Sequence, residues 1–402
     1  MNAAFINILK TIRRSNWMLT IMVVALLIVG VMFVYSACYV GEDRTMRPLY
    51  ERQIVWMIAG FACYATLALY DFQHLKSISW AIYGSSLVLL VLVLFIGSTI
   101  YGAKRWLMLF GPNGIGIQPS EIAKLSTIIL LAHQLSQSGR NLARFRDLAI
   151  MGALILVPIG LILMQPDLGT AIVFIPTAFI MMFVAGLPFK YLAVISGTGI
   201  LIIAFILSTL FLPAKLGASQ ETQAKLRNWS GLKIHQQERI EVFFHPEKDP
   251  LGKGWNKRQS EIAVGSGGMK GKGFLKGTQN ILGFLPRTVA PTDFIYSVIA
   301  EEKGFVGSLS VLGLFFGVLS FGMLTALRTR DAMGRLLCVG VVSMIFCHVF
   351  INIAMTVGLM PITGLPLPLL SYGGSFMIMI MSALGIIQSV YIRSHKRDAY
   401  RA

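Results

Sequence analysis

The chain has 402 residues, of which 55% are hydrophobic and only 13% charged, and its mean hydropathy is +0.70. These values exclude an ordinary soluble domain and indicate an integral membrane protein. Basic residues outnumber acidic ones by 35 to 18, so the location of the positive charge is informative about orientation.

Ten apolar segments are long enough, at roughly 20 residues each, to be candidates for crossing a bilayer. The sequence therefore predicts one all-α polytopic membrane domain over residues 1–402, with about ten transmembrane helices. A large extracytoplasmic loop, residues 213–292, is expected between helices seven and eight. The predicted helices are Trp17–Cys38, Ile54–Leu69, Ile78–Phe95, Ile117–Gln134, Leu148–Met164, Ala171–Leu187, Tyr191–Leu212, Phe305–Leu327, Leu336–Leu359 and Leu369–Ile392.

Basic residues in the short connections predict the orientation. With an even number of helices, the basic connections and both termini fall on one side, which the positive-inside rule assigns to the cytoplasm. The long segment 213–292 then faces the exterior or periplasm. The basic connections contain Arg140, Arg144 and Arg146, then Arg328, Arg330 and Arg335, and the tail contains Arg393, Lys396, Arg397 and Arg401.

The segment 213–292 is itself basic, with thirteen Lys and Arg against six Asp and Glu. An excess of positive charge outside the membrane suggests an anionic ligand. Its glycine-rich part, GSGGMKGKGF, lacks the spacing of a nucleotide-binding P-loop. These glycines either supply turns or place backbone amides around phosphate oxygens. A short amphipathic piece around Ile240 and Phe243 is expected on the bilayer surface.

Several charged residues fall inside or beside the apolar segments, where each needs a partner or a wet cavity. In GAKRWL and QPSEIAKL these are Arg105, Glu121 and Lys124. Glu121 and Lys124 are three residues apart and can pair on one helix face. The pair is interpreted either as an intramembrane salt bridge or as part of a polar cavity that opens outward.

Two further outer connections contain candidate polar residues. QPDLGTA places Asp167 before a helix, where it can act as a cap without any other function. The proline-rich stretch ending in LPLPLLSYGGS places Ser371 and Ser375 near the start of the last helix. Small residues there permit close helix approach or line a groove.

Six motifs in this order resemble the signatures of the SEDS family (shape, elongation, division and sporulation). They are GAKRWL, QPSEIAKL, QPDLGT, the run FFHPEKDPLGKGWNKRQSEIAVGSGGMKGKGFLKGTQ, TDFIYSVIAEEKGFVG and GLPLPLLSYGGS. The GSGG, GKG and GTQ run is more similar to the elongation members than to the division members.

The resemblance implies a peptidoglycan glycosyltransferase of the bacterial cytoplasmic membrane that polymerises lipid II beside a class B penicillin-binding protein. The family's catalytic aspartate lies in the TDF motif, which is Asp293 here. The matching motifs also supply the candidate residues for binding the diphosphate or lining the cavity, which are Arg105, Glu121, Lys124, Asp167, Gln259, Lys272, Gln279, Ser371 and Ser375. We expect no nucleic-acid partner and no resident metal site, although Mg²⁺ or Mn²⁺ could accompany the lipid diphosphate.

Chemistry supports a base at Asp293, because joining a sugar hydroxyl to an anomeric carbon requires removal of a proton. The alternative is that Asp293 only begins a helix, where a carboxylate is favoured by the dipole. The family pattern is broken nearby, since Arg287 replaces a glutamate and Pro291 stands where histidine is common. Arg287 is expected to lower the pKa of a nearby carboxylate.

Two other functions remain as alternatives. A lipid II flippase is one, although the sequence shows no convincing internal repeat of the kind that secondary transporters have. A scaffold that only recruits a crosslinking partner is the other, and it would leave the polar residues near the outer face unexplained.

Overall fold

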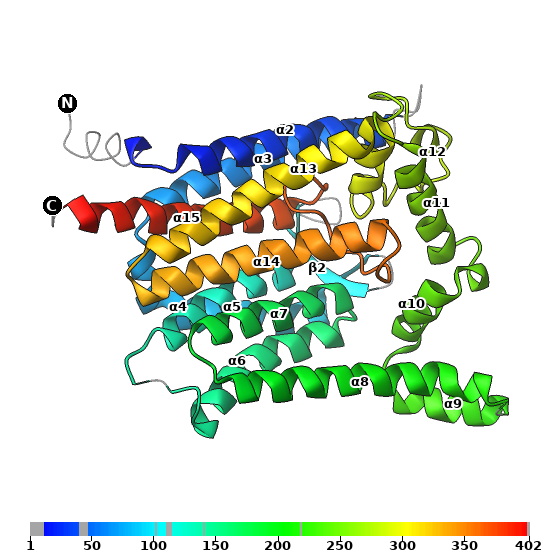
Figure 1. Cartoon of the computed structure of the whole chain (residues 1–402), viewed down its shortest axis with the longest axis horizontal. Helices are drawn as coiled ribbons and strands as arrows, with labels where there is room; N and C mark the ends of the chain where they lie inside the picture. Colours follow the sequence, from blue (N-terminus) through cyan, green and yellow to red (C-terminus); the bar gives the residue numbers. More distant parts are fainter. Residues whose placement is uncertain are drawn as a thin grey trace.

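The computed structural model describes residues 12–39, 47–100, 103–109, 115–139, 141–217 and 219–399. Long, roughly parallel helices form one bundle, and a group of short helices stands at one of its ends (Figure 1). The bundle helices are α2 (Trp17–Cys38), α3 (Arg47–Leu69), α4 (Leu75–Ile96), α5 (Pro119–Leu135), α6 (Phe145–Met164), α7 (Leu168–Val184), α8 (Phe189–Lys215), α13 (Ile295–Arg328), α14 (Ala332–Thr356) and α15 (Gly374–Ala399).

Among the described residues, eight helices are long and apolar enough to cross a membrane. The remaining two predicted segments correspond to α5 and α7, which have 17 residues each. Helix α7 is apolar, whereas α5 contains Glu121 and Lys124. The protein is thus a polytopic helical membrane protein, and the number of ten spans stays a prediction.

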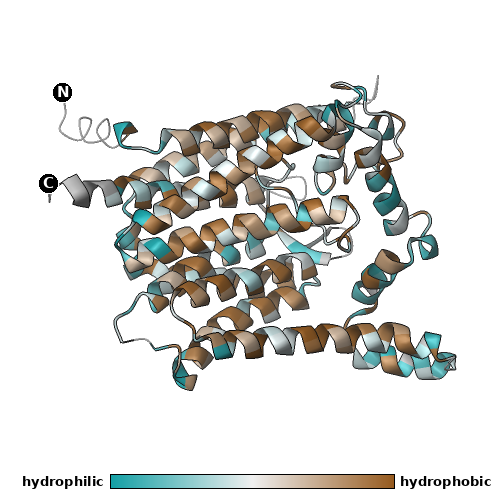
Figure 2. Ribbon diagram, viewed as in Figure 1, coloured by the Kyte–Doolittle hydropathy of each residue, from teal (hydrophilic) through white to brown (hydrophobic). Residues whose placement is uncertain are grey.

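Burial divides the bundle into an inner and an outer part. Helices α14 and α15 are largely buried by their neighbours, whereas α8 exposes most of its apolar surface and packs mainly against α9 (Gln220–Trp229). Figure 2 shows hydrophobic residues along the bundle helices and hydrophilic residues gathered on the short helices at the end. This pattern fits a bundle whose outer side chains face lipid.

Several predicted helix starts were wrong, including that of α3, which begins at Arg47 rather than Ile54. Helix α13 begins at Ile295 rather than Phe305, because Glu301 and Glu302 are buried in its first part and the helix is interrupted at Gly304 (φ 66°, ψ −162°). The last helix begins at Gly374, since Leu369 has φ 64°, which α-helical backbone cannot accept.

The segment 213–292 is more structured than a loop. It begins inside α8, which continues to Lys215, and it then forms a series of short helices. Because these helices are short and polar, their apolar residues show little helical periodicity in the sequence. These helices are α9, α10 (Ile234–Phe244), η2 (Pro246–Lys248), α11 (Lys253–Ser266) and α12 (Thr278–Ile281).

A small antiparallel sheet, which the all-α prediction missed, lies between α4 and α5. Its order is β1 (Ser98–Ile100), β2 (Ala103–Leu109) and β3 (Ile115–Ile117). Leu107 of β2 pairs with Ile117 of β3, so Ile117 is a strand residue and not the first residue of a helix. The sheet is relevant to the site because β2 carries Arg105.

Candidate active site

Asp293 lies in the turn that leads into α13, at the end of the bundle covered by the short helices. Its backbone N–H donates to the Val289 carbonyl (2.9 Å), and its own carbonyl accepts from Asn352 Nδ2 (2.9 Å). Asn352, on α14, also donates to the Leu365 carbonyl at 2.7 Å. One buried amide therefore fixes Asp293 relative to the proline-rich loop 357–373.

Ser371 is a structural member of this site. Its hydroxyl donates to the Thr292 carbonyl and accepts from the Leu367 N–H (2.8 Å). The Tyr372 N–H donates to the Pro291 carbonyl at 2.8 Å, one residue before Thr292. The loop and the turn that presents Asp293 are thus held together through backbone groups.

Arg239 of α10 contacts the same proline-rich loop, and it is not among the site residues predicted from the sequence. Its guanidinium donates to the carbonyls of Ile362 (3.3 Å) and Thr363 (2.9 Å), and its Nε is buried without a hydrogen-bond partner among the described residues. Burial and the nearby Arg105 lower the pKa of Arg239, while Asp167 and Asp293 raise it. These effects show two cations and two carboxylates close together.

The Arg105–Asp167 pair completes this group. Arg105 Nη1 lies 3.6 Å from Asp167 Oδ1, and Gln118 Nε2 donates to Asp167 Oδ2 at 3.0 Å. Asp167 also caps α7 by accepting from the backbone N–H of Thr170 (3.2 Å). Asp167 is thus a helix cap that also pairs with Arg105, and its candidate role in substrate binding stays a prediction.

Desolvation controls the charge of Asp293. Burial raises the pKa of its carboxyl from 3.8 to about 6, while a hydrogen bond from Thr292 and the charges of Arg239 and Arg105 oppose the change. The expected direction was wrong, because burial outweighs the neighbouring cations. Arg239 and Arg105 are two cations that act on this pKa, and neither was predicted to do so.

Glu121 and Lys124 form a buried ion pair inside the bundle. Lys124 Nζ lies 2.9 Å from Glu121 Oε2 and 2.9 Å from His348 Nε2 on α14. Both charged side chains are at most 5% exposed, so the pair is a polar contact between α5 and α14. Ser375 lies beside the N-terminal end of α5, where it donates to the Gly116 carbonyl (2.9 Å) and accepts from the Gln118 N–H (3.2 Å).

Lys272 and Gln279 belong to a second cluster around the two adjacent carboxylates of α13. Lys272 Nζ lies 2.6 Å from Glu301 Oε1, and the Gln279 N–H donates to the same oxygen at 3.0 Å. Glu302 accepts from Ser36 of α2 at 2.5 Å. In the described contacts these residues hold the glycine-rich segment against α13 and are not joined to Asp293.

Gln259 is buried on α11, and none of the described hydrogen bonds joins its side chain to either cluster. The adjacent Ser260 bonds Ser297 of α13 (2.7 Å) and the Thr356 carbonyl (2.7 Å). Among the described residues, no group of three or more His, Cys, Asp or Glu side chains could hold a metal ion. The chemistry available from the described residues is thus a partly desolvated carboxylate beside two guanidinium groups.

Comparison with known families identifies the chain. The model of the FtsW, RodA and SpoVE family, described as cell cycle proteins, matches residues 16–396. The chain belongs to this family. It is 34% identical to the peptidoglycan glycosyltransferase RodA of Treponema pallidum, over 96% of this chain and 99% of that protein. It is also 34% identical to the peptidoglycan glycosyltransferase MrdB of Escherichia coli K12, over 92% of each chain.

Solved structures of the family have the same fold. A chain of a peptidoglycan synthase complex, described as coordinating polymerization and crosslinking, matches with a TM-score of 0.72 and 32% identity, covering 96% of this chain and 99% of that one. The rod shape determining protein RodA of Thermus thermophilus matches with a TM-score of 0.65 and 30% identity, covering 96% and 98%. The family resemblance of the six motifs is confirmed.

Proposed function

We propose that this family member is a peptidoglycan glycosyltransferase that polymerises lipid II, with Asp293 as the general base. The names of its relatives, RodA and MrdB, support the activity. The observation that carries the residue assignment is the position of Asp293, whose backbone is fixed by the buried Asn352 and whose carboxylate, with a pKa of about 6, interacts electrostatically with Arg239 and Arg105. Such a base is ionised at neutral pH and still basic enough to accept a proton.

The reaction needs one displacement. Ionised Asp293 takes the proton of the acceptor sugar hydroxyl as its oxygen attacks the anomeric carbon of the donor. The bond from that carbon to the lipid diphosphate breaks, and the electron pair leaves with the diphosphate. An α-linked donor then gives a β-linked product by inversion, and no covalent sugar intermediate forms.

Arg239 and Arg105 are the proposed cations for stabilising the negative charge that develops on the diphosphate. Both already act on Asp293, and the buried Nε–H of Arg239 is a donor with no partner among the described residues. Fixed cations in a partly dry site stabilise a departing diphosphate without reorganisation. A Mg²⁺ or Mn²⁺ ion would have to be held largely by diphosphate oxygens, because the described residues offer no group of three or more suitable side chains.

The proposed setting is the outer face of the bacterial cytoplasmic membrane, with both termini in the cytoplasm. A class B penicillin-binding protein is the proposed partner, and the similarity to a synthase complex that couples polymerization with crosslinking supports it. The arrangement leaves Asp293 on the side where the glycan strand is assembled.

The experiment that tests this function uses the purified full-length chain, reconstituted with and without its class B partner. We expect lipid II to be converted into glycan chains that are resolved on a gel. The flippase alternative is measured in the same proteoliposomes with fluorescent lipid II. Transport of the lipid from leaflet to leaflet without any polymer, with or without the partner, would contradict the proposed function.

A further inference from the structure

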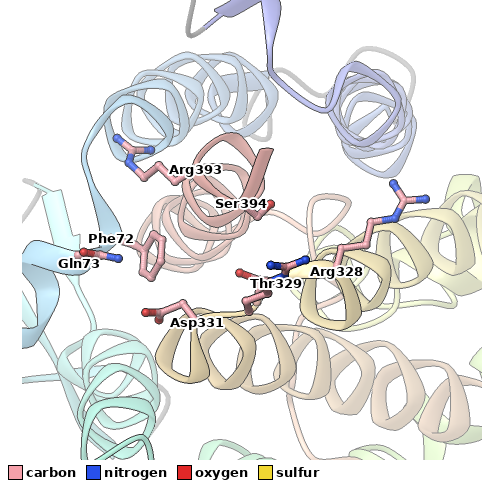
Figure 3. A pocket seen from close by; sticks show the side chains of 8 residues that line it. Phe72, Gln73, Arg328, Thr329, Asp331, Arg393 and Ser394 are labelled. Atoms are coloured by element: carbon pink, nitrogen blue, oxygen red, sulfur yellow. The ribbon is translucent and has the colours of Figure 1, made fainter. Parts of the chain in front are cut away.

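A basic pocket lies at the end of the bundle opposite Asp293. The turn between α13 and α14, the short helix η1 (Phe72–His74) and the end of α15 surround it (Figure 3). The start of α2 and the end of α15 lie at the same end (Figure 1). Since α13 runs the length of the bundle from Asp293 to Arg328, this pocket is separated from the proposed catalytic site by the whole membrane domain.

Three arginines line the pocket, and they differ in what they bind. The Arg393 guanidinium lies 3.2 Å from Asp71 and donates to the carbonyls of Ala68 (3.1 Å) and Leu69 (2.5 Å), which end α3. Figure 3 shows its side chain turned away from Arg328. Arg393 therefore holds α15 against α3.

Arg328 and Arg330 differ from Arg393 in this respect. Both side chains are exposed, and neither forms an ion pair or hydrogen bond with any residue that the structure describes. The acidic residue of the pocket, Asp331, is already used, because it accepts from the Gly334 N–H (2.8 Å) and lies 3.9 Å from Lys76. Arg328 and Arg330 thus line the pocket together with the buried Phe72 and Thr329, and Figure 3 shows the Arg328 side chain directed away from Phe72, at the rim of the pocket.

The surface next to these arginines is apolar. Leu324 and Leu327 on α13 are 41% and 73% exposed, and Trp17 at the start of α2 is 52% exposed. Helix α2 packs along α13, with Met22 against Gly317, so Trp17 lies toward the same end as Leu327. Tryptophan and arginine above exposed leucines mark the level of lipid headgroups.

We propose that this end of the bundle binds the phosphate headgroup of an anionic phospholipid, with Arg330 in the pocket and Arg328 at its rim as the donors. Guanidinium groups bind phosphate oxygens in pairs of hydrogen bonds. The leucines beside them would contact the acyl chains, which distinguishes a lipid from a free phosphate. Anionic headgroups are enriched in the cytoplasmic leaflet, and basic pockets between transmembrane helices on that side recognise them.

The test is native mass spectrometry of the full-length chain in detergent, titrated with short-chain phosphatidylglycerol, short-chain phosphatidylcholine and inorganic phosphate. The double variant Arg328→Gln/Arg330→Gln should weaken phosphatidylglycerol binding by about thirtyfold, from roughly 1 kcal/mol per arginine. The matched control Arg13→Gln/Arg14→Gln removes the same charge from exposed positions at the same end, outside the pocket, and should bind as the wild type does.

Several results would overturn the proposal. If the Arg328→Gln/Arg330→Gln variant binds phosphatidylglycerol as tightly as the wild type does, the two arginines are not part of the site. If the control variant loses the same affinity, only the general surface charge matters. Equal binding of phosphatidylcholine would show that the phosphate charge is not recognised. Inorganic phosphate bound as tightly as phosphatidylglycerol would show an anion site without lipid specificity. Thermal unfolding of each variant confirms that it is folded.

Discussion

Arg239 shows how a single side chain can connect a peripheral helix to the site. It lies on α10 in the segment outside the bundle, yet it donates to two carbonyls of the loop that packs on Asp293. From the sequence, an arginine beside Ile240 and Phe243 is typical of an interfacial helix, so nothing marked it as part of the site. Asp293 was predicted because the TDF motif is specific, not because the charge pattern required it.

We predict that Arg239→Gln lowers the rate of polymerisation by about 100-fold, the usual loss when one preorganised donor is removed from an active site. Arg239→Lys should restore only part of the rate, because one ammonium cannot replace the planar fork that reaches both carbonyls. Initial rates with purified lipid II measure both effects.

The matched control for Arg239 is Lys225→Gln, which removes one positive charge from the same segment. Lys225 is 73% exposed, and within the described part of the chain it pairs only with Glu221 (2.7 Å) on its own helix, so its loss should change the rate by less than about twofold. Equal losses in both variants would mean that the general charge of the segment matters, and not the position of Arg239.

The break in α13 is the clearest feature at the level of elements. At Gly304 the backbone has φ 66°, and the N–H of Phe305 donates to the Gly268 carbonyl (2.8 Å) instead of continuing the helix. In the same place the N–H groups of Lys272 and Gly273 donate to the carbonyls of Glu301 and Glu302. The glycine-rich segment is therefore docked on α13 through its backbone, so turns explain these glycines better than a phosphate cradle does.

We predict that Gly304→Ala destabilises the protein by at least about 2 kcal/mol, from left-handed backbone strain and overpacking. A Cβ there would lie 2.3 Å from the Gly271 nitrogen. The control is Gly313→Ala on the same helix, where a Cβ would meet nothing within 4 Å. It should be neutral or slightly stabilising. Thermal unfolding in detergent compares them, and equal stability of the two variants would contradict this account of the docking.

Hydropathy alone located the long helices because each must bury about 20 apolar residues in lipid. Trp17–Cys38 was predicted with its observed bounds. The elements that failed are those whose stability comes from tertiary contacts, namely the short strands around Arg105 and the helices of the segment 213–292. Their residues gain partners only after folding. Local sequence patterns therefore did not predict the sheet or the contact between α10 and the proline-rich loop.

At the scale of the whole molecule, polar groups gather at both ends of an apolar bundle. One end places Asp293 with Arg239, Arg105 and Asp167, and the other carries Arg328 and Arg330 beside exposed leucines. Two groups of predicted site residues lie at the Asp293 end. Arg105, Asp167 and Ser371 adjoin Asp293, whereas Lys272 and Gln279 contact Glu301. Sequence motifs showed which residues matter to the family but not which of them meet in space.

The most direct test of the central claim is the pH dependence of kcat/KM for lipid II polymerisation, compared between the wild type and Asp293→Asn. A base with a pKa of about 6 is ionised above that pH, so the wild-type rate should be maximal near pH 7 and fall about tenfold by pH 5. Asp293→Asn should be at least about 100-fold slower and lack this acidic limb, while remaining folded. A wild-type rate that is unchanged between pH 5 and pH 7, or an asparagine variant that polymerises normally, would contradict the role of Asp293.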